Sequence, residues 1–371
     1  MIFFYLLTGV VCVTYIVLIV SYLIGWIRTL AFVKSNTPSQ TNVSIIIPAR
    51  NEEENISKCI DSIISQRYPA SLFEIIVVND HSIDGTAAIV KSLNIPGLKL
   101  INLQESEIGK KSALAAGIKS ANGSLIITTD ADCGRNADWL ATIVSFYEKK
   151  TPKMIVAPVL LKNETSFMQI IQSQEMTVLT ACSAASLYYN SPLLCSGANL
   201  IYEKEAFLAV NGFENNEKIS TGDDIFLMLK FKKKFPGEIK FLKSVEAAVT
   251  TNAEERSSSA LNQRKRWASK TFSYGFSNIT VIAVIIFLMN FLVLMSGIVS
   301  VINIKFVFAL MTSFSCKCIV DFMLLHSASS FFKKRANPVA FFLASAIYPV
   351  YVSAIGLVAP FTKYSWKGRK L

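Results

Sequence analysis

Two kinds of apolar pattern separate the ends of the chain from its middle. Residues 1–27 form an apolar stretch without a charged side chain. The tail contains three further apolar stretches, which are Val281–Ile302, Phe306–Leu325 and Phe341–Pro360. A helix needs roughly 20 apolar residues to cross the hydrocarbon core of a bilayer. We therefore predict a transmembrane anchor at 1–27 and a C-terminal transmembrane region at 281–360 with two or three spans.

The tail leaves the number of spans open. Lys317 and Asp321 interrupt the second stretch, but they are four residues apart on one helical face and can pair inside a bundle. Pro349 lies in the third stretch and can make it kinked or re-entrant. Three full spans after a cytosolic domain would also put the basic residues of 363–370 outside, against the positive-inside rule.

The first basic residues of the chain, Arg28 and Lys34, directly follow the apolar start. A cleaved signal peptide would have basic residues before its apolar run, so we expect an uncleaved anchor. The positive-inside rule then puts the following domain in the cytosol, with the protein as a multi-pass component of the cell membrane (plasma or inner).

The middle region, 43–278, has the pattern of a globular α/β domain. Val43–Ile47, Ile75–Val78 and Leu125–Thr128 are short runs rich in β-branched residues, and segments with helical periodicity follow the first two. This alternation predicts a mainly parallel sheet with helices on both faces. In such sheets ligands bind beyond the carboxyl ends of the strands. Polar clusters follow all three strands, at 48–54, 79–84 and 130–132.

Composition and charge agree with a membrane-associated protein. Hydrophobic residues make up 52% and charged residues 17% of the 371-residue chain, whose net charge is +11. We interpret the basic residues around 230–234 and 264–266 as a surface attracted to anionic lipid, since nothing else indicates nucleic-acid binding. The seven cysteines lack zinc-site spacing, and we expect them to be reduced thiols.

The segment TTDADC, 128–133, offers a site for a hard cation. Asp130 and Asp132 follow a predicted buried strand and can face a common Mg²⁺ or Mn²⁺, which prefer carboxylate and phosphate oxygens. Two aspartates that only form a turn and cap a helix are the alternative. In the preceding cluster, Asp80 can accept hydrogen bonds from a base, whereas Asp84 and Gly85 suit a turn.

Two later segments carry further candidate chemistry. Asp223 and Asp224 precede an apolar helix, where they can act as a general base or simply cap the helix. In QRKRW, 263–267, Arg264 and Arg266 can clamp phosphate, and Trp267 can stack on a sugar or lie at the membrane interface. An amphipathic interfacial helix with a basic face is the alternative for this segment.

The order of these segments resembles the family 2 glycosyltransferases, the inverting group that includes cellulose, chitin and hyaluronan synthases and ceramide glucosyltransferase. The resemblance runs from about Val43 to Trp267. Its elements, in order, are PARNEE (48–53), Asp80, GK-x-x-AL (109–114), D-x-D (Asp130 and Asp132), GAN (197–199), the acid pair Asp223–Asp224, and Q-x-x-R-W (263–267).

The resemblance implies a GT-A fold and a role for each matching residue. Asp132 would bind the divalent metal, Mg²⁺ or Mn²⁺, together with Asp130, and Asp80 would bind the uracil of a UDP-sugar. Asp224 would be the catalytic base, although Asp223 stands where the family has Glu. The residues implied to line the donor are Pro48, Arg50, Glu52, Asp80, Lys110 and Asp130. Those implied to bind the pyrophosphate and the acceptor are Gln263, Arg264, Arg266 and Trp267.

We therefore expect an inverting transfer of sugar from a nucleotide-sugar to a lipid or lipid-linked acceptor in the bilayer. Sugar, acceptor and oligomeric state are left open. A processive polysaccharide synthase is the nearest alternative, and two or three tail spans offer little material for a channel. A non-catalytic binding protein or transporter would be expected to lose an acid or to have more spans. A nucleotidyltransferase would usually carry a glycine-rich basic loop where PARNEE stands.

Overall fold

The computed structural model describes most of the chain in two compact units. The described residues are 1–35, 39–214, 223–255, 257–268, 277–358, 365–366 and 369–370. The unit that contains the large sheet, called here the sheet unit, comprises 29–163 and 186–252. The other, called the helical unit, comprises 1–28, 164–185 and 253–371.

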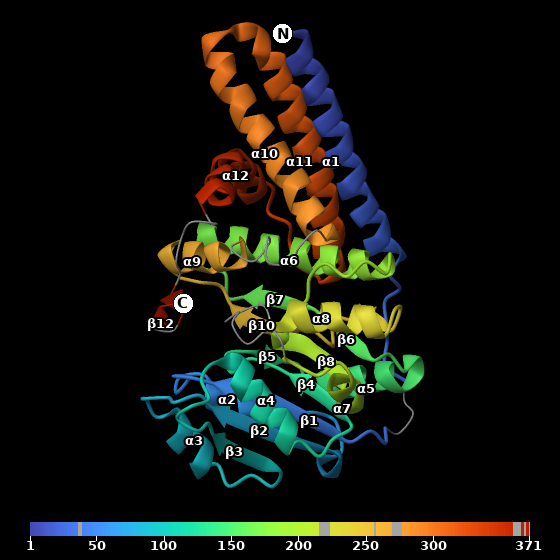
Figure 1. Ribbon diagram of the computed structural model, residues 1–371, viewed down its shortest axis with the longest axis vertical. Helices are drawn as coiled ribbons and strands as arrows, with labels where there is room; N and C mark the ends of the chain where they lie inside the picture. The colour runs from blue at the N-terminus through green and yellow to red at the C-terminus, as the bar shows by residue number, and fades with distance from the viewer. Residues whose placement is uncertain are drawn as a thin grey trace. The chain divides into compact units, whose positions relative to one another are not determined.

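A seven-stranded sheet forms the centre of the sheet unit, with the order β3-β2-β1-β4-β8-β6-β9 (Figure 1). β1, β2, β3 and β4 are parallel, as the alternation of strands and helices predicts. The strands are β1 (Val43–Ala49), β2 (Phe73–Asn79), β3 (Leu98–Asn102), β4 (Leu125–Thr128), β6 (Met154–Val156), β8 (Leu200–Glu203) and β9 (Ile239–Phe241).

The sheet is mainly parallel, as predicted, with one reversed strand: β8 runs antiparallel to both β4 and β6, and β9 is parallel to β6. The reversed direction of β8 determines which residues reach the site. β8 begins at the edge of the sheet where β4 ends, since Thr128 pairs with Leu200. The 3₁₀ turn η2 (Gly197–Asn199), which directly precedes β8, is therefore delivered to the carboxyl edge of the parallel strands.

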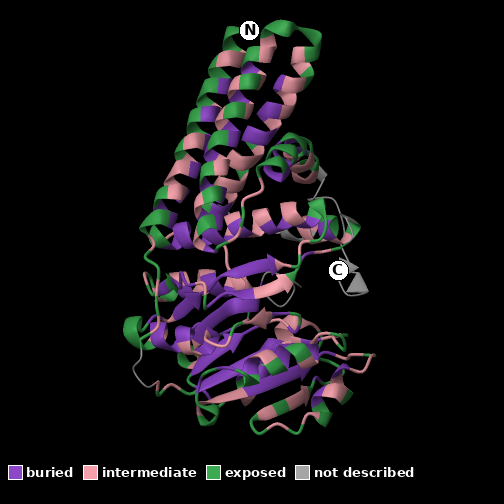
Figure 2. Ribbon diagram, turned by 180° about the vertical axis from the view of Figure 1, so that it is seen from behind, coloured by how far each residue is buried: buried purple, intermediate pink, exposed green. Residues whose placement is uncertain are grey.

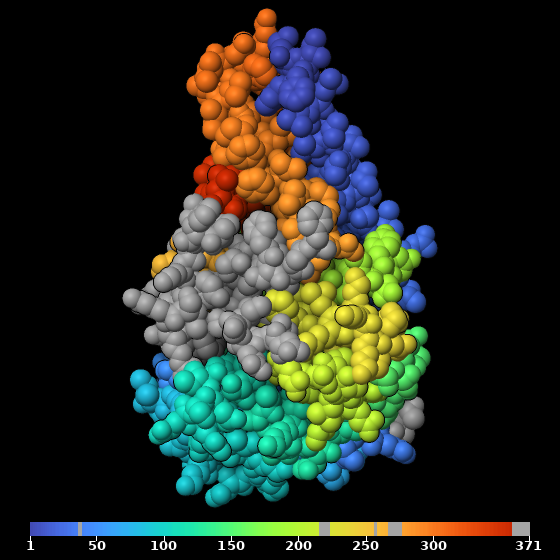
Figure 3. Space-filling view, viewed as in Figure 1, coloured from blue at the N-terminus to red at the C-terminus, as the bar shows by residue number. Residues whose placement is uncertain are grey.

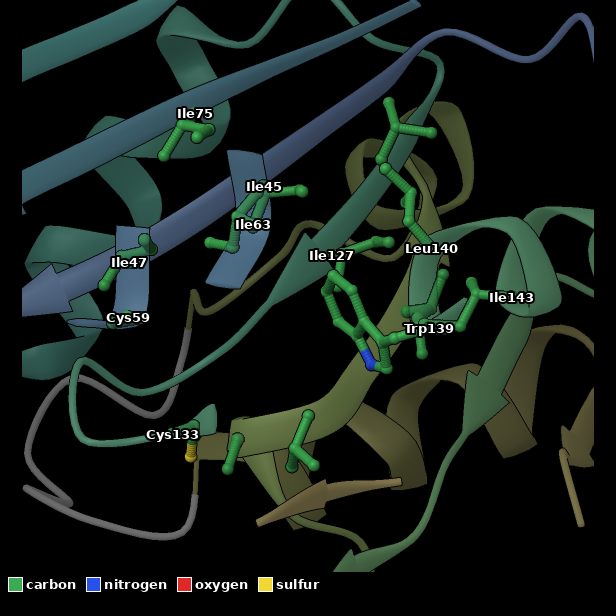
Figure 4. Packing of buried hydrophobic residues seen from close by; sticks show 14 of the residues in the cluster. Ile45, Ile47, Cys59, Ile63, Ile75, Ile127, Cys133, Trp139, Leu140 and Ile143 are labelled. Atoms are coloured by element: carbon green, nitrogen blue, oxygen red, sulfur yellow. The ribbon is translucent and has the colours of Figure 1, made fainter. Parts of the chain in front are cut away.

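Buried residues are concentrated on the strands of the sheet unit, as the purple ribbon in Figure 2 shows, and apolar side chains from these strands and their covering helices form its core. Ile45, Ile127 and Trp139 belong to this cluster, and Figure 4 shows them packed between the sheet and α5. Gly117 of α4 lets that helix approach closely, because a Cβ there would lie 2.6 Å from Cγ2 of Ile46. The helices are α2 (Ile56–Ile64), α3 (Thr86–Ser92), α4 (Lys110–Ser120), α5 (Trp139–Lys150), α7 (Lys204–Ala209) and α8 (Asp223–Lys234), with the 3₁₀ turn η1 (Ala70–Leu72).

A second, three-stranded sheet lies beside the turn that follows β4. Its order is β5-β10-β7, with β5 antiparallel and β7 parallel to β10. The strands are β5 (Gly134–Arg135), β7 (Val159–Lys162) and β10 (Val249–Asn252). β5 starts two residues after Asp132, so β10 is hydrogen-bonded to the chain immediately beyond the D-x-D segment.

The helical unit contains long helices with almost no charge. Those long and apolar enough to cross a membrane are Ile2–Arg28, Asn278–Ile302, Ile304–Phe331 and Pro338–Leu357. All three tail stretches thus qualify by length and composition. The helices are α1 (Ile2–Arg28), α10 (Asn278–Ile302), α11 (Val307–Phe331, preceded by η4, Ile304–Phe306) and α12 (Pro338–Val358), with α6 (Phe167–Tyr188) and α9 (Ser257–Ala268); a short hairpin, β11 (Ser365–Trp366) and β12 (Arg369–Lys370), follows.

α1, α10 and α11 lie side by side as a three-helix bundle, whereas α12 runs crosswise to them (Figure 1). Pro349 is inside α12. The expected pairing in α11 is confirmed, because Nζ of Lys317 lies 2.6 Å from Oδ2 of Asp321. Tyr15 of α1 donates a hydrogen bond to the other oxygen of Asp321 at 2.8 Å.

The basic helix α8 lies at the surface on the face that Figure 3 shows, in yellow. Two of its lysines have a local structural role. Lys230 donates to the carbonyl oxygens of Gly212 and Glu214 at 2.7 Å, and Lys234 donates to that of Ala209. These lysines therefore satisfy carbonyl groups at and beyond the C-terminus of α7.

Candidate active site

The carboxyl ends of β1, β2 and β4 meet at one edge of the sheet, as the sequence predicts. Ala49 pairs with Asn79, and the backbone N–H of Asp80 donates to the carbonyl of Ala49 at 2.9 Å. The N–H of Thr129 donates to Ile46 at 3.1 Å. The loops that begin at Arg50, Asp80 and Asp130 are thus neighbours because the strands before them are paired.

Arg50 joins the first two loops. Its guanidinium donates to the carbonyl oxygens of Asp80 at 2.8 Å and His81 at 3.2 Å. Asp80 is buried, and His81 adopts a φ of 53°, with its ring Nε2 3.0 Å from the carbonyl oxygen of Glu107. These contacts shape a fixed, polar end to β2 where the base of a nucleotide was expected.

The remaining polar residues of these loops support the backbone. Glu52 accepts a hydrogen bond from Asn55 at 2.9 Å, and its own N–H donates to the Thr86 hydroxyl at 2.8 Å. Asp84 accepts from the N–H of Thr86 at 3.0 Å. Burial alone would raise the pKa of Asp84, but several hydrogen bonds, chiefly those from Thr86, together outweigh it and hold the pKa below its usual value. The turn interpretation of Asp84 is confirmed.

Asp130 and Asp132 differ in their surroundings. Asp130 forms an ion pair with Lys110, the first residue of α4, while both side chains stay partly exposed. Burial opposes the charge of Lys110, but the neighbouring Asp130 outweighs it and raises the pKa of the lysine. Asp132 is exposed, and its Oδ2 accepts a hydrogen bond from the hydroxyl of Thr251 at 2.9 Å.

The donor set at this turn fits a hard cation that a ligand helps to hold. Within the described part of the chain, no group of three or more His, Cys, Asp and Glu side chains is placed to bind a metal. Asp130 and Asp132 would therefore supply carboxylate oxygens, and phosphate oxygens of a bound ligand would complete the shell. Such a shared arrangement is usual for Mg²⁺, which is bound through one or two carboxylates plus phosphates.

Arg135 supports the turn from the inside of the fold. Its guanidinium donates to the hydroxyl of Thr129 and to the carbonyl of Cys133, both at 3.0 Å. It also lies over the ring of Trp139, 4.9 Å from the centroid. The aspartate-bearing turn is thus anchored by a residue just beyond it.

The two adjacent acids at the start of α8 have different environments. Asp223 is buried and lies 3.3 Å from Nζ of Lys111. Burial raises the pKa of Asp223 above its usual value, against the lowering effect of Lys111. Asp224 is half-buried, and its Oδ2 accepts a hydrogen bond from the N–H of Gly197 at 3.0 Å. Asp223 therefore faces inward, and Asp224 faces the edge of the sheet.

Gly197 brings Asp224 and Lys110 to one place. A Cβ built on Gly197 would lie 3.6 Å from Nζ of Lys110 and 3.9 Å from the Asp224 carboxylate. Lys110 is consequently beside Asp130 on one side and close to Asp224 on the other. Asn199 of the same turn is fully buried and donates to the carbonyls of Pro158 and Ala247 at 2.8 and 2.9 Å, so its role is to hold the turn.

The Q-x-x-R-W segment forms part of α9, as its helical interpretation predicts. α9 belongs to the helical unit, where Arg264 forms an ion pair with Glu175 of α6. The backbones of Arg266 and Trp267 are helical, but their side chains lie outside the described residues. Thr221 and Gly222, before the acid pair, also lie outside them.

Two residues of the site, Lys111 and Thr251, belong to no sequence motif. Lys111 follows the matched Lys110, and Thr251 stands far along the chain in an ordinary strand. Both are identified only because the fold puts Lys111 against Asp223 and Thr251 against Asp132. A sequence signal for Thr251 would have required knowledge of the β5–β10 pairing.

Comparison with known proteins connects this site to a family. Residues 44–207 match the model of the family described as Glycosyl transferase family 2. This range contains the loops at Arg50, Asp80 and Asp130 and the turn at Gly197, and it ends before Asp223.

Curated relatives extend the likeness beyond that range. The chain is 28% identical over 243 residues to a poly-β-1,6-N-acetyl-D-glucosamine synthase of Staphylococcus epidermidis, covering 64% of this chain and 57% of the relative. It is 27% identical over 194 residues to a dolichyl N-acetyl-α-D-glucosaminyl phosphate 3-β-D-2,3-diacetamido-2,3-dideoxy-β-D-glucuronosyltransferase of Methanococcus voltae, covering 50% and 56%. The chain thus spans little more than half the length of these relatives.

A solved structure agrees with the fold over nearly the whole chain. The mannosyltransferase PcManGT of Pyrobaculum calidifontis, in complex with GDP-Man and Mn²⁺, superposes with a TM-score of 0.59 at 17% identity. The superposition covers 96% of this chain and 99% of that one. The expected GT-A fold is confirmed. Together with the family match, these findings support an enzyme over the alternatives of a binding protein, a transporter or a nucleotidyltransferase.

Proposed function

This glycosyltransferase carries a glycosyl transferase family 2 domain, and from that premise we propose that it transfers sugar from a UDP-sugar to a lipid or lipid-linked acceptor at a membrane. One observation carries the proposal. Lys110 lies between a half-exposed aspartate that follows β4, Asp130, and a half-buried aspartate that starts α8, Asp224. Lys110 can supply positive charge to a diphosphate, and Asp224 can accept the proton of an acceptor hydroxyl. Both residues therefore lie at one edge of the sheet.

The donor side of the site comprises the loops after β1, β2 and β4. Asp80, at the fixed end of β2, would accept hydrogen bonds from the base, and the backbone around Pro48, Arg50 and Glu52 would line the nucleotide. Asp130 and Asp132 would hold a divalent cation against the diphosphate. The neighbour of the same fold, PcManGT, has GDP-Man and Mn²⁺ bound, which supports the proposal of a cation beside a nucleotide-sugar. When bound, the cation would stabilise the negative charge of the leaving diphosphate.

Asp224 is a better candidate for the general base than Asp223, because the two carboxylates have different surroundings. A general base has to reach the proton that it removes. Asp223 is buried against Lys111, whereas Asp224 is half-buried at the sheet edge, with the N–H of Gly197 orienting one oxygen. The other oxygen, Oδ1, accepts a hydrogen bond from the N–H of Ile225 at 2.9 Å. Each carboxylate oxygen has a second lone pair, so Asp224 can still take a proton from an acceptor that enters at this edge.

The reaction is a single displacement. Asp224 accepts the proton of the acceptor hydroxyl while that oxygen bonds to the anomeric carbon, and the bond from this carbon to the diphosphate oxygen breaks. Attack opposite to the leaving diphosphate inverts the anomeric configuration. Lys110 would exchange its contact with Asp130 for a contact with the diphosphate, where its fixed positive charge offsets the charge that develops.

The helical unit supports a membrane location. We propose that α1, α10 and α11 cross the bilayer with the sheet unit on the cytosolic side, and that α12, crosswise to them, does not cross. The residues after α12 then stay on the side where α11 ends. This arrangement removes the conflict between three tail spans and the basic residues of 363–370. Within α9, Gln263, Arg264, Arg266 and Trp267 are proposed to bind the pyrophosphate and the acceptor.

A processive polysaccharide synthase is the second candidate, because the polymer-forming relative of Staphylococcus epidermidis covers 64% of this chain. The two candidates differ in their product. Single transfer would leave one labelled sugar on an organic-soluble lipid, whereas a synthase would place label in polymer that remains at the origin of a chromatogram.

A radiolabel screen tests the proposal. Membranes that contain the protein are incubated with labelled UDP-sugars and Mg²⁺ or Mn²⁺, and organic-soluble label is measured. Asp224→Asn keeps the shape of the side chain but removes its basicity, so we expect about a 1000-fold loss of transfer. Asp223→Asn should retain much more activity. Equal transfer by wild type and Asp224→Asn would overturn the base assignment, and absence of transfer from every UDP-sugar would overturn the proposed donor.

A further inference from the structure

Asp132 lies on the turn after β4, and its carboxylate is exposed. To bind a metal in one orientation, this side chain has to be held by a neighbouring group. An exposed aspartate side chain can occupy several rotamers, and fixing one of them on metal binding costs conformational entropy. A hydrogen bond that already holds the side chain reduces this cost. Ligating carboxylates in proteins are in turn hydrogen-bonded for this reason.

The second sheet supplies such a hydrogen bond. The hydroxyl of Thr251, in β10, donates to Oδ2 of Asp132 at 2.9 Å. On the other oxygen, Oδ1, the structure places the Cys133 thiol at 3.6 Å, a weak donor. A carboxylate has about four lone-pair sites, so Asp132 can accept hydrogen bonds and also bind a cation.

The position of Thr251 is determined by backbone pairing rather than by the loop itself. β10 pairs with β5, with Thr250 opposite Gly134 and Val249 opposite Arg135. On its other side, β10 pairs in parallel with β7, where Thr251 is opposite Leu161. Thr251 is thus paired with β7 and directly follows Thr250, which is paired with β5, so its hydroxyl reaches the turn from a strand of the second sheet.

We propose that Thr251 is a positioning residue of the cation site, whose hydroxyl holds Asp132 in the orientation that binds a divalent metal with the nucleotide diphosphate. The proposal rests on the assignment of Asp132 as a metal ligand in the proposed function. Loss of one hydrogen bond to a ligand typically weakens metal affinity 10- to 100-fold.

The chain offers a matched control in the neighbouring residue. Thr250 stands in the same strand, and its hydroxyl lies 3.4 Å from the backbone carbonyl of Gly134 rather than near a carboxylate. Thr250→Val therefore repeats the loss of a threonine hydroxyl in β10 without removing the contact to Asp132. Thr251→Ser keeps the hydroxyl and removes a methyl group.

The experiment measures Mn²⁺ binding directly, independently of sugar transfer. The full chain in detergent is titrated with Mn²⁺ in the presence of UDP and, in a parallel series, GDP. The signal of free Mn²⁺ is followed by electron paramagnetic resonance and corrected against solutions without protein. Thr251→Val is expected to raise the Kd for Mn²⁺ about tenfold, with Thr251→Ser and Thr250→Val within about twofold of wild type and unchanged melting temperatures.

An Asp132 variant tests the metal assignment separately from the role proposed for Thr251. Asp132→Asn should lose the Mn²⁺ site. If it does, and Thr251→Val binds Mn²⁺ like wild type, the role of Thr251 is wrong while the metal assignment stands. If Asp132→Asn binds Mn²⁺ like wild type, both the metal assignment and the role of Thr251 are wrong. If Thr250→Val weakens binding as much as Thr251→Val, the effect belongs to the strand and the specific role of Thr251 is overturned.

Discussion

Two lysine–aspartate pairs, one in each compact unit, have opposite surroundings. In the sheet unit, Lys110 and Asp130 have side chains that are 29% and 36% exposed. In the helical unit, the Lys317 and Asp321 side chains are 7% and 19% exposed, and Tyr15 donates a further hydrogen bond to Asp321. The first pair can exchange partners with a ligand, whereas the second is satisfied by its own protein.

The difference shows that ion pairing alone does not identify a site. A charge among apolar helices is costly to leave unpaired, so Lys317 and Asp321 have to neutralise each other. At the edge of the sheet, Lys110 and Asp130 are partly buried but still reach solvent, so a charged ligand can approach them and take the place of one partner. Exposure and neighbouring groups, rather than the pair itself, therefore distinguish a reactive pair from a structural one.

The largest effect is expected from a variant that breaks the structural pair, Lys317 and Asp321. Asp321→Leu leaves Lys317 charged among apolar helices and should destabilise the protein by about 3–5 kcal/mol. Adding Lys317→Met removes the orphaned charge and should recover most of the loss. Thermal unfolding in detergent measures both. If the single and double variants are equally destabilised, the helices depend on packing at these positions rather than on charge neutralisation.

Breaking the partly exposed pair, Lys110–Asp130, should lower activity rather than stability. Lys110→Met removes the positive charge beside the diphosphate and is expected to lower kcat/KM about 100-fold, with a melting temperature close to that of wild type. Initial rates with the labelled donor and a thermal melt provide the comparison. A variant that loses stability but keeps its catalytic efficiency would make Lys110 a structural residue like Lys317.

A smaller change probes the space between Lys110 and Asp224. Gly197→Ala adds a methyl group 3.6 Å from Nζ of Lys110, in ordinary van der Waals contact. Folding should tolerate it, but the group occupies the place where a donor would contact both residues. We expect kcat to fall about tenfold. Unchanged kinetics in this variant would mean that the donor does not enter beside Gly197.

The smallest effect concerns a third lysine, Lys243, which is buried in the sheet unit and donates to the carbonyl of Thr29 at 3.0 Å. Burial lowers its pKa from 10.5 to about 8. Between these values the unfolded chain binds more protons than the folded one, so stability rises with pH. Relative to Lys243→Met, wild type should gain about 1 kcal/mol from pH 7.5 to 9.5. Parallel stability curves for the two proteins would show that Lys243 does not titrate in this range.

The sequence alone was sufficient to predict the strands that begin the sheet and the loops that follow them. β4 has the bounds expected from its run of apolar residues, and Asp130 follows it at the sheet edge. It also predicted the pairing of Lys317 with Asp321, because four residues make one helical turn. These features depend on neighbours along the chain, which a sequence displays directly.

Other features depend on residues that are distant along the chain. The reversed β8 delivers Gly197 to the site, and this reversal arises from pairing across some seventy positions, between Thr128 and Leu200. The different surroundings of Asp223 and Asp224, and the contact of Thr251 with Asp132, likewise arise from packing between separate elements. Local pattern thus determined which residues can carry the chemistry. The tertiary structure decided which of them face one another, because burial and pairing are properties of the folded chain.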